Sequence, residues 1–464
     1  MTAEHSRTEY DSLGAVTLPA DALYGAQTQR ACDNFPVSGQ PMPPGFLAQL
    51  CRVKASCAQA NMQVAGLASE IGHAIAASAD ELAEQLAEGQ MQQAFPVDVY
   101  QTGSGTSSNM NSNEVIARLA GERMGGLVHP NDHVNMSQSS NDVIPTAMRV
   151  NAVVALDTAL YPAVMALLHQ LEARRADIGA IVKTGRTHLM DATPIRFEQV
   201  IDGWLAQISL ALADLERAGE RMRALPLGGT AVGTGLNAPE GFRAAVVEAL
   251  NQRLGKQLRA PLTLMSHPIA GMGAQDDAAA LSGALRGLAG VLLKISNDLR
   301  WMNSGPQAGL GEITLPALQP GSSIMPGKVN PVIPESVAMV AVDVQGRDLA
   351  VNTAACSGNF ELNVMLPLIA RNLDEMIRLS ANASHLLADK AIAGFVVNQA
   401  RIEQDLAANP ILVTALNRVI GYEKGAQIAK TAYQQQRSVL DVAEELTDLS
   451  REALAELLNP ARLT

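Results

Sequence analysis

Apolar residues recur every three or four positions in three long segments of the chain. The three stripes comprise Val153, Leu156, Leu160, Val164, Leu167 and Leu171, then Ile201, Leu205, Ile208, Leu212, Leu215 and Met222, and then Leu281, Leu285, Leu288, Leu292, Ile295, Leu299 and Met302. Residues with this spacing share one face of an α-helix. The pattern therefore predicts three long helices that each bury one face against a neighbour.

Two further helices are expected at residues 337–351 and 369–387, where the apolar stripes contain smaller side chains. Five long helices together predict one central bundle. Pro162 lies inside the first stripe, where a proline removes a backbone donor and either kinks the helix or marks a restart. The sequence leaves both outcomes open.

Length and changes of composition divide the chain. Its 464 residues exceed the size at which one hydrophobic core usually stops growing. Several prolines before residue 45 predict an irregular arm that leads into helices, and after about Gly394 the chain becomes more charged and its apolar segments shorter. We predict a mainly helical N-terminal domain at residues 1–141, a central long-helix bundle at 142–393 and a small helical C-terminal domain at 394–464.

Composition narrows the function classes. Hydrophobic residues make up 47% of the chain but aromatic residues only 3%, which favours a core of close-packed helices. A net charge of -12 argues against general affinity for nucleic acid or anionic membranes, because both require a basic surface. The four cysteines are too sparse for a disulfide framework. No signal peptide and no membrane-spanning apolar run are expected from the sequence, so the predicted location is cytoplasmic.

Four segments between the predicted helices are rich in Gly, Ser, Thr and Asn: residues 102–113, 137–141, 228–237 and 321–330. Each segment alone is explained as a connector that caps a helix. Four such segments, all dense in hydrogen-bonding groups, indicate a binding surface for a polar ligand.

Common cofactor motifs are missing from these segments. The loop at 321–330 is not a phosphate-binding P-loop, because five residues separate Gly321 from Gly327 and Val follows Lys328. No dinucleotide-binding glycine pattern and no nucleophile elbow occur, so no cofactor is predicted. His129 and His133 are four residues apart, but Pro130 disfavours a regular helix there and no third ligand is evident, so no metal is predicted.

A series of polar motifs follows in a fixed order along almost the whole chain. The motifs are Gly25-Ala-Gln-Thr-Gln-Arg30, Gly103-Ser-Gly-Thr106, Asn109-Met-Asn111, His129-Pro-Asn-Asp132, Ser137-Gln-Ser-Ser-Asn-Asp142, Gly185-Arg-Thr-His188, Gly228-Gly-Thr-Ala-Val-Gly-Thr-Gly-Leu-Asn237 and Gly321-Ser-Ser-Ile-Met-Pro-Gly-Lys-Val-Asn330. This series resembles the fumarase/aspartase superfamily, and most closely its class II fumarases. The resemblance implies an all-α, three-domain fold with a central long five-helix bundle, assembled as a homotetramer with a twenty-helix core.

The resemblance also implies a reaction, the reversible anti addition of water to fumarate, which gives L-malate through an aci-carboxylate intermediate. A proton next to a carboxylate is very weakly acidic, because its removal adds negative charge to an anion. Hydrogen-bond donors that are fixed before the reaction are an effective way to stabilise that charge. The partners expected are therefore a small dicarboxylate and other copies of the chain, with active sites shared between subunits.

Particular residues are assigned by the resemblance. Ser322 is the base that takes the C3 proton, Lys328 and Asn330 hold the carboxylate that gains charge, and His188 with Glu335 handles the proton on the leaving oxygen. The substrate-binding residues implied are Ser104, Gly105, Thr106, Ser139, Ser140, Asn141, Thr187, Ser323, Lys328, Val329 and Asn330. Taken singly, Ser322 is also explained as a helix cap, Lys328 as a solvated surface cation and His188 as an ordinary histidine.

Some motifs depart from the family's pattern. A secondary anion site is implied at His129, Pro130, Asn131 and Asp132, but residues 125–128 lack the basic residues that often precede it, which argues against that site. Residues 331–335 and 363–367 are more similar to the ammonia-lyase branch, whereas the motifs ending at Thr106, Asn141 and Arg30 resemble the hydratase branch. Fumarate hydration is the favoured function and aspartate ammonia-lyase the alternative. A catalytically silent scaffold is the competing class, but it predicts damaged loop residues, and these are intact.

Helix length gives an independent inference about assembly. If residues 142–181 form mostly one helical span, roughly 35 residues at about 1.5 Å each separate its ends by about 50 Å. Asn141 and His188 then cannot touch one substrate within a single subunit. If both contact it, neighbouring subunits must complete the site, which predicts an obligate oligomer.

Overall fold

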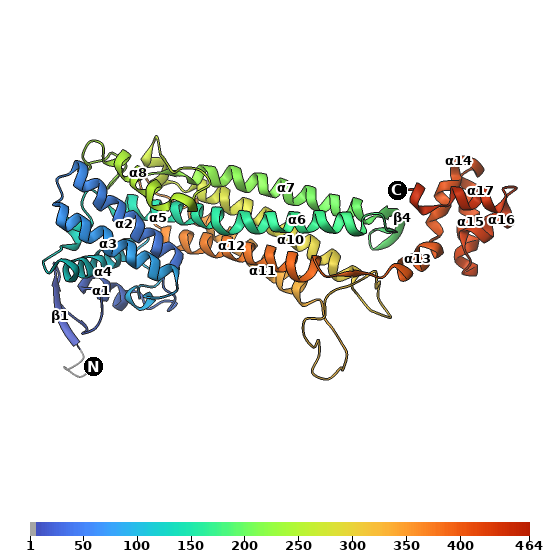
Figure 1. Cartoon of the computed structure of the whole chain (residues 1–464), viewed down its shortest axis with the longest axis horizontal. Helices are drawn as coiled ribbons and strands as arrows, with labels where there is room; N and C mark the ends of the chain where they lie inside the picture. Colours follow the sequence, from blue (N-terminus) through green and yellow to red (C-terminus); the bar gives the residue numbers. More distant parts are fainter. Residues whose placement is uncertain (1–5) are drawn as a thin grey trace. The chain divides into compact units, whose positions relative to one another are not determined.

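The computed structural model describes residues 6–464, and long helices dominate it (Figure 1). All five long helices expected from the apolar stripes are present. They are α5 (Ser140–Ala155) continued by α6 (Tyr161–Ile178), α7 (Phe197–Met222), α10 (Asp276–Met302), α11 (Val332–Ala355) and α12 (Leu366–Leu387). The predicted all-α fold is confirmed, with a few short strands in addition.

Pro162 does not interrupt the first of these helices. A π turn, η4 (Leu156–Leu160), links α5 to α6, and Pro162 is the second residue of α6. A proline inside a helix removes one backbone hydrogen bond, and the π turn directly before Pro162 changes the hydrogen-bond pattern there without ending the helix. The result is one helical span of 39 residues from Ser140 to Ile178.

The chain divides into two compact units. One contains the residues up to Pro162, together with Leu212–Ala289 and Val342–Ala381, and the other contains Ala163–Ala211, Gly290–Ala341 and Asn382–Thr464. The long helices contribute residues to both units, because the chain passes repeatedly from one unit to the other. The three-domain division predicted from the sequence follows chain order instead and stays a prediction.

In the first unit, α2 (Pro44–Val64) packs against α3 (Ser69–Ala87), α5 and α8 (Phe242–Leu254). Most of α2 is buried, including Phe46, Leu50 and Val53. Helix α4 (Thr106–Met124) packs on α3 and on α1 (Ala26–Asn34). A buried central helix surrounded by others is the arrangement that the Ala-rich and Leu-rich composition favours.

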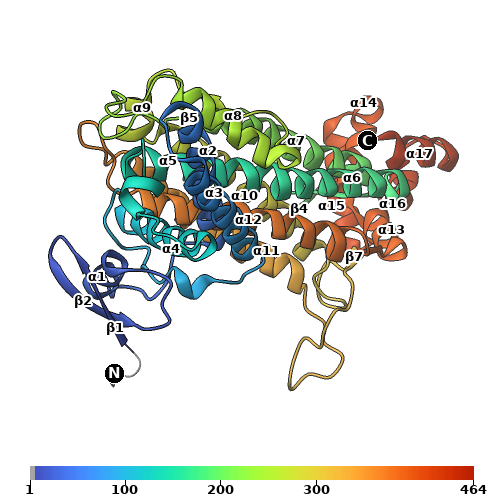
Figure 2. The ribbon, with the colours of Figure 1, turned by 60° about the vertical axis from the view of Figure 1, so that its left-hand side comes forward.

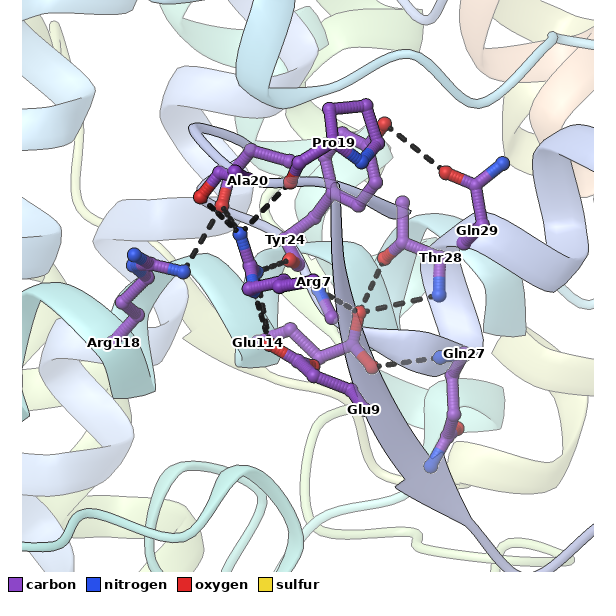
Figure 3. Close-up of polar contacts among 12 residues, drawn as sticks. Arg7, Glu9, Pro19, Ala20, Tyr24, Gln27, Thr28, Gln29, Glu114 and Arg118 are labelled. Atoms are coloured by element: carbon purple, nitrogen blue, oxygen red, sulfur yellow. Dashed lines mark hydrogen bonds and ion pairs between the residues drawn. The ribbon is translucent and has the colours of Figure 1, made fainter. Parts of the chain in front are cut away.

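The N-terminal arm is more regular than expected. Strands β1 (Ser6–Asp11) and β2 (Gly14–Pro19) form an antiparallel hairpin, which lies with α1 beside α4 (Figure 2). The Arg7 guanidinium donates to the carbonyl oxygens of Pro19, Ala20, Ala22 and Tyr24, and the Glu114 carboxylate accepts from the backbone of residues 25, 27 and 28 at the start of α1 (Figure 3). The expectation of an irregular arm was wrong for residues 6–19. The apolar signal was weak there, because Val16 and Leu18 are the buried apolar side chains of the hairpin.

In the second unit, β3 (Val182–Thr187) and β4 (Met190–Arg196) form a hairpin, and a cluster of short helices ends the chain (Figure 1). The short helices are α13 (Gln399–Ala408), α14 (Asn417–Ile420), α15 (Tyr422–Gln435), α16 (Val439–Leu446) and α17 (Arg451–Leu457). They enclose a hydrophobic cluster that includes Leu416, Ile428, Val442 and Leu454. The other short strands and helices are α9 (Pro268–Gly273), β5 (Ala224–Leu225) and β6 (Thr263–Leu264) in the first unit, and β7 (Ile313–Thr314) and β8 (Val396–Val397) in the second.

Two helical spans are long and apolar enough to cross a membrane, by length and composition alone: Ser140–Ile178 and Asp276–Met302. The expectation that no apolar run reaches this length was therefore wrong. The most apolar stretches of these spans are 67% and 44% buried inside the protein. Core helices of soluble proteins satisfy the same criterion, so the finding is weak evidence for a membrane span.

Candidate active site

Residues 104–106 form the start of α4. Gly105 is the N-cap residue, with a φ of 74° in the left-handed region that favours glycine, and Thr106 is the first helical residue. A Cβ atom at Gly105 would lie 2.8 Å from the Ile144 side chain of α5, so only glycine fits. The Ser104 and Thr106 hydroxyl oxygens are 2.8 Å apart. The N-terminus of a helix attracts anions, so these hydroxyl groups lie where a carboxylate is stabilised.

Residues 139–141 form the start of α5. Ser139 and Asp142 make a capping box, so the Ser139 side chain is used to cap the helix. The Ser140 hydroxyl oxygen accepts a hydrogen bond from the Asn109 side chain at 3.0 Å, which leaves its O–H group free to donate to a ligand. The Asn141 side-chain amide donates to the Ala231 carbonyl oxygen at 2.8 Å. The starts of α4 and α5 are thus joined, through Asn109, into one surface rich in donors.

Asp142 connects this surface to the loop at 228–237. Its carboxylate accepts the backbone N–H groups of Ser139, Gly228 and Thr230 at 3.0, 2.8 and 2.9 Å. Burial raises the pKa of Asp142 to about 6, against the lowering effect of these hydrogen bonds. Three of the four polar segments predicted from the sequence therefore meet in one unit. Sequence reasoning missed Asn109 and Asp142 as organising residues, although the Ser139-x-x-Asp142 spacing is a capping-box signal.

The segment at 363–367, which resembles the ammonia-lyase branch, lies next to the same surface. The Leu366 backbone N–H donates to the Gly103 carbonyl oxygen at 3.0 Å. A Cβ atom at Gly103 would come within 1.7 Å of the Val364 carbonyl oxygen. The glycine that precedes Ser104 is therefore required by the contact with this segment.

In the second unit, the loop at 321–330 is closed by its own hydrogen bonds. The Gly321 N–H donates to the Lys328 carbonyl oxygen at 2.7 Å, and the Asn330 side-chain amide donates to the Gly321 carbonyl oxygen at 2.8 Å. The Ser322 Oγ accepts the backbone N–H groups of Ile324 and Met325 at 3.2 and 3.1 Å. Two N–H groups directed at one hydroxyl oxygen favour its deprotonated form, as a serine base requires.

Lys328, Val329, Asn330 and Glu335 line one cavity of about 600 Å³ in this unit. Other residues on its wall are Arg300, Trp301, Asn303, Ser304 and Asn398. Within residues 6–464, Lys328 forms no ion pair. Its ammonium group is therefore available to a bound carboxylate.

Thr187 and His188 lie at the tip of the β3–β4 hairpin. His188 and Leu189 form the two-residue turn, and both have positive φ values, 56° and 60°, as a type I′ turn requires. The base of the hairpin is fixed by Glu312, only 2% exposed, which forms ion pairs with Arg186 at 2.7 Å and Lys183 at 3.0 Å. Among the described residues, His188 makes no hydrogen bond to Glu335. Within the described part of one chain, Lys328, Asn330 and Glu335 therefore line the same cavity, but His188 is not hydrogen-bonded to Glu335.

The motif at 129–132 begins a π turn, η3 (Pro130–Val134). The His129 Nδ1 accepts the Asp132 backbone N–H at 3.1 Å, and the His133 Nδ1 accepts the His129 N–H at 2.9 Å. Both Nδ1 atoms are therefore occupied by the turn itself. His129, Pro130 and Asn131 line a cavity of about 610 Å³ to which Arg7 and Arg118 also contribute. Glu9, Asp11 and Glu114 line the same cavity, so its wall carries charges of both signs.

Nearly the whole chain is similar to known proteins. Residues 14–346 match the family described as Lyase, and residues 412–464 match the family described as Fumarase C C-terminus. The chain is 54% identical to the class II fumarate hydratase 2 of Pseudomonas aeruginosa, over 99% of this chain and 98% of that protein, and 53% identical to the class II fumarate hydratase of Xylella fastidiosa, over 100% and 96%. A crystal structure of the class II fumarase of Schistosoma mansoni superimposes with a TM-score of 0.94 at 34% identity and covers 99% of each chain.

Proposed function

Because the chain belongs to the class II fumarate hydratase family, we propose that it catalyses the reversible, stereospecific hydration of fumarate to L-malate. The observation that carries a mechanism for this chain is the position of Ser322. Its Oγ lies against two backbone N–H groups in a closed loop, so an alkoxide formed there is stabilised. Such a serine acts as the base that removes the C3 proton of malate, and in the hydration direction it returns that proton.

Two sets of donors hold the substrate. In the first set, Lys328 and Asn330 bind the carboxylate that gains negative charge, and the free cation of Lys328 stabilises the aci-carboxylate more than the ground state. Ser323 and Val329 belong to the same loop and shape its surface. In the second set, Ser104, Thr106, Ser140 and Asn141 donate to substrate carboxylates at two helix N-termini. Thr187 and His188 act from the hairpin tip, where His188, which meets Glu335 when the subunits assemble, transfers the proton of the leaving hydroxyl group.

The active protein is proposed to be a homotetramer. On α11, Met339, Val342 and Leu349 are exposed and share one face of the helix, while the opposite face is buried. At five glycines on the long helices, Gly203, Gly283, Gly287, Gly290 and Gly346, no described atom outside the adjoining helix backbone lies within 4 Å of where a Cβ would be. An exposed apolar stripe and open glycine positions are accounted for when helices of other subunits pack closely against these faces.

The length of the first helix supports sharing of active sites between subunits. Its 39 residues extend over roughly 58 Å at about 1.5 Å per residue. Asn141 lies at its beginning, and His188 follows its end by ten residues along the chain. A helix of this length between the two residues favours a site that residues from different subunits complete.

The function is tested by mixing the purified protein with fumarate and following the ultraviolet absorbance of the double bond, with and without ammonia. Loss of absorbance in water alone is the expected result, accompanied by formation of L-malate. A requirement for ammonia would establish aspartate ammonia-lyase activity instead. No change under either condition would support the catalytically silent scaffold.

Sharing of sites is tested by subunit complementation. The variants N141A and S322A are each expected to be nearly inactive as pure proteins. When the two are unfolded together and refolded, some sites combine Asn141 from one subunit with Ser322 from another and regain activity. Refolded mixtures that stay as inactive as the parents would contradict the shared site.

The same family membership leads us to propose a cytoplasmic location and the three-domain division at residues 1–141, 142–393 and 394–464. The separate hydrophobic cluster of the short C-terminal helices supports the last of these domains. The secondary anion site at 129–132 is proposed with Arg7 and Arg118 near it, because both arginines line the same cavity.

A further inference from the structure

Lys54 is a lysine whose side chain is fully buried. It lies on α2, and its side chain has no exposed surface. Its Nζ donates to the Asn135 Oδ1 and the Gln138 Oε1, both at 3.0 Å. In the described part of the chain, residues 6–464, no ion pair includes it. Because lysines are almost never fully buried without an ionic partner, the position of this ammonium group calls for a functional reason.

The two acceptors belong to the segment that connects η3 to α5. The Asn135 Oδ1 also accepts the side-chain amide of Asn109 at 3.1 Å. The same Asn109 amide donates to the Ser140 Oγ at 3.0 Å. A continuous series of hydrogen-bonded groups therefore runs from Lys54 through Asn135 and Asn109 to Ser140, which is one of the proposed substrate-binding residues.

We propose that Lys54 is a positioning residue for the dicarboxylate substrate. Its ammonium group holds residues 135–138 in the conformation that places Ser140 and Asn141 at the start of α5, and it adds a buried positive charge behind them. A charge in the low-dielectric interior acts more strongly on a nearby anion than an exposed charge does. The inference rests on the proposed function, because Ser140 and Asn141 are assigned to the substrate there.

The surroundings of Lys54 define the pH range in which it acts. Burial lowers the pKa of Lys54 to about 8. The other titratable groups that face it are Cys51 and Cys57 on α2 and Asp142 on α5. Burial raises the pKa of both thiols to about 12 and that of Asp142 to about 6. Between about pH 7 and pH 10, Lys54 is therefore the member of this cluster that changes charge.

The test compares K54M, which keeps the length of the side chain without its charge, with K54R, which keeps the charge. In K54M, KM for fumarate and the dissociation constant of succinate, a saturated four-carbon dicarboxylate, should each rise about tenfold, while kcat stays within about twofold, as expected when binding is lost equally in the ground state and the transition state. K54R should restore most of the affinity. L50A is the matched control, because it removes buried volume from the same helix and should lower the unfolding temperature while leaving KM unchanged.

The pH dependence of succinate binding gives a second readout. In the wild type, affinity should fall as the pH rises through about 8, because the charged form of Lys54 is lost. K54M should bind succinate weakly at all pH values, and K54R should keep its affinity well above pH 8, because a guanidinium stays protonated. Unchanged KM and succinate affinity in folded K54M would overturn the inference.

Two further outcomes are distinguishable. If K54M does not fold, a K54R pH profile with the wild-type midpoint would overturn the role of Lys54 on its own. If the wild type binds succinate but does not hydrate fumarate, the proposed function fails. The K54M comparison of succinate affinity still decides whether Lys54 positions a dicarboxylate.

Discussion

The two parts of the proposed site differ in how much of their geometry a single chain supplies. Around the starts of α4 and α5, the substrate-facing residues are fixed by buried groups such as Asn109, only 1% exposed, and Asp142. The loop at 321–330 and the hairpin tip are bound mainly to themselves, and Ile324 and Leu189 are 82% and 61% exposed. In Figure 1 the connection between α10 and α11, which includes this loop, projects away from both helices.

This difference predicts different roles for the two parts of the site. Binding groups that are fixed by a protein's own core need no further ordering when the substrate arrives, which lowers the cost of binding. Groups on exposed segments gain their final environment only when another surface covers them. We therefore expect changes in the buried part to alter both stability and substrate affinity, and changes in the exposed part to alter catalysis or assembly.

The largest effect is expected at Ser322 in the exposed part. S322A removes the base, so kcat should fall about 10³-fold, while the half-exposed position leaves the free energy of unfolding nearly unchanged. Initial rates of fumarate consumption and urea unfolding measure the two quantities. S323A, one residue further on, is the control and should lose less than about tenfold. A kcat for S322A close to that of the wild type would remove Ser322 from the mechanism.

The next effect is expected at Asp142 in the buried part. D142A leaves three backbone N–H groups without their acceptor and should lower the free energy of unfolding by about 3 kcal/mol. It should also weaken fumarate binding, because Ser139 and Thr230 lose the carboxylate that holds both of their backbone N–H groups. D98A is a control for the number of hydrogen bonds lost, since Asp98 is a buried carboxylate that accepts the N–H groups of residues 38, 39 and 100 instead of those of residues 139, 228 and 230. If D98A weakened fumarate binding as much as D142A, the effect would be one of general stability.

Lys54 predicts a pH dependence of stability in the buried part. Its folded pKa of about 8 lies below the unfolded value near 10.4, so the unfolded chain binds more protons between these values. Stability of the wild type relative to K54M should therefore rise as the pH increases from 8 to about 10.4, by about 3 kcal/mol in total. Urea unfolding of both proteins at equal concentration across this range measures the difference. A constant difference would contradict the burial of a charged lysine.

The smallest effect is expected at the hairpin tip. Leu189 has a φ of 60°, which a branched side chain adopts unfavourably, whereas asparagine tolerates this region. L189N should stabilise the turn by about 1 kcal/mol, seen as slower hydrogen exchange of the β3 and β4 amides. Faster exchange would indicate that Leu189 is buried by another subunit, which would place part of the exposed half in an interface.

The sequence predicted the long helices well because their apolar stripes are long and uninterrupted. The prediction for residues 6–19 failed because that hairpin buries few apolar side chains, and periodicity detects burial. The motifs also located the polar segments that meet at Asp142. They could not indicate which side chains would face the substrate, since the Ser139 side chain is used as a helix cap.

Lys54 shows why part of the site is hidden from sequence reasoning. From its position in the sequence of α2 alone, Lys54 would be interpreted as an ordinary lysine on the solvated face of a helix. Its role depends on Asn135 and Gln138, which are about eighty residues away in the chain. Contacts between distant residues of this kind follow from the three-dimensional packing, which helical spacing does not encode.

The continuous helix from Ser140 to Ile178 also constrains how the chain can vary. Inserting or deleting one residue within a helix turns everything beyond it by about 100° and shifts it by about 1.5 Å. Such a change would turn the apolar face of the helix beyond it, which includes Leu167 and Leu171, away from the core in which those residues are buried. Insertions and deletions should therefore be confined to connections such as the one between α10 and α11, whereas the number of residues in this helix should stay constant.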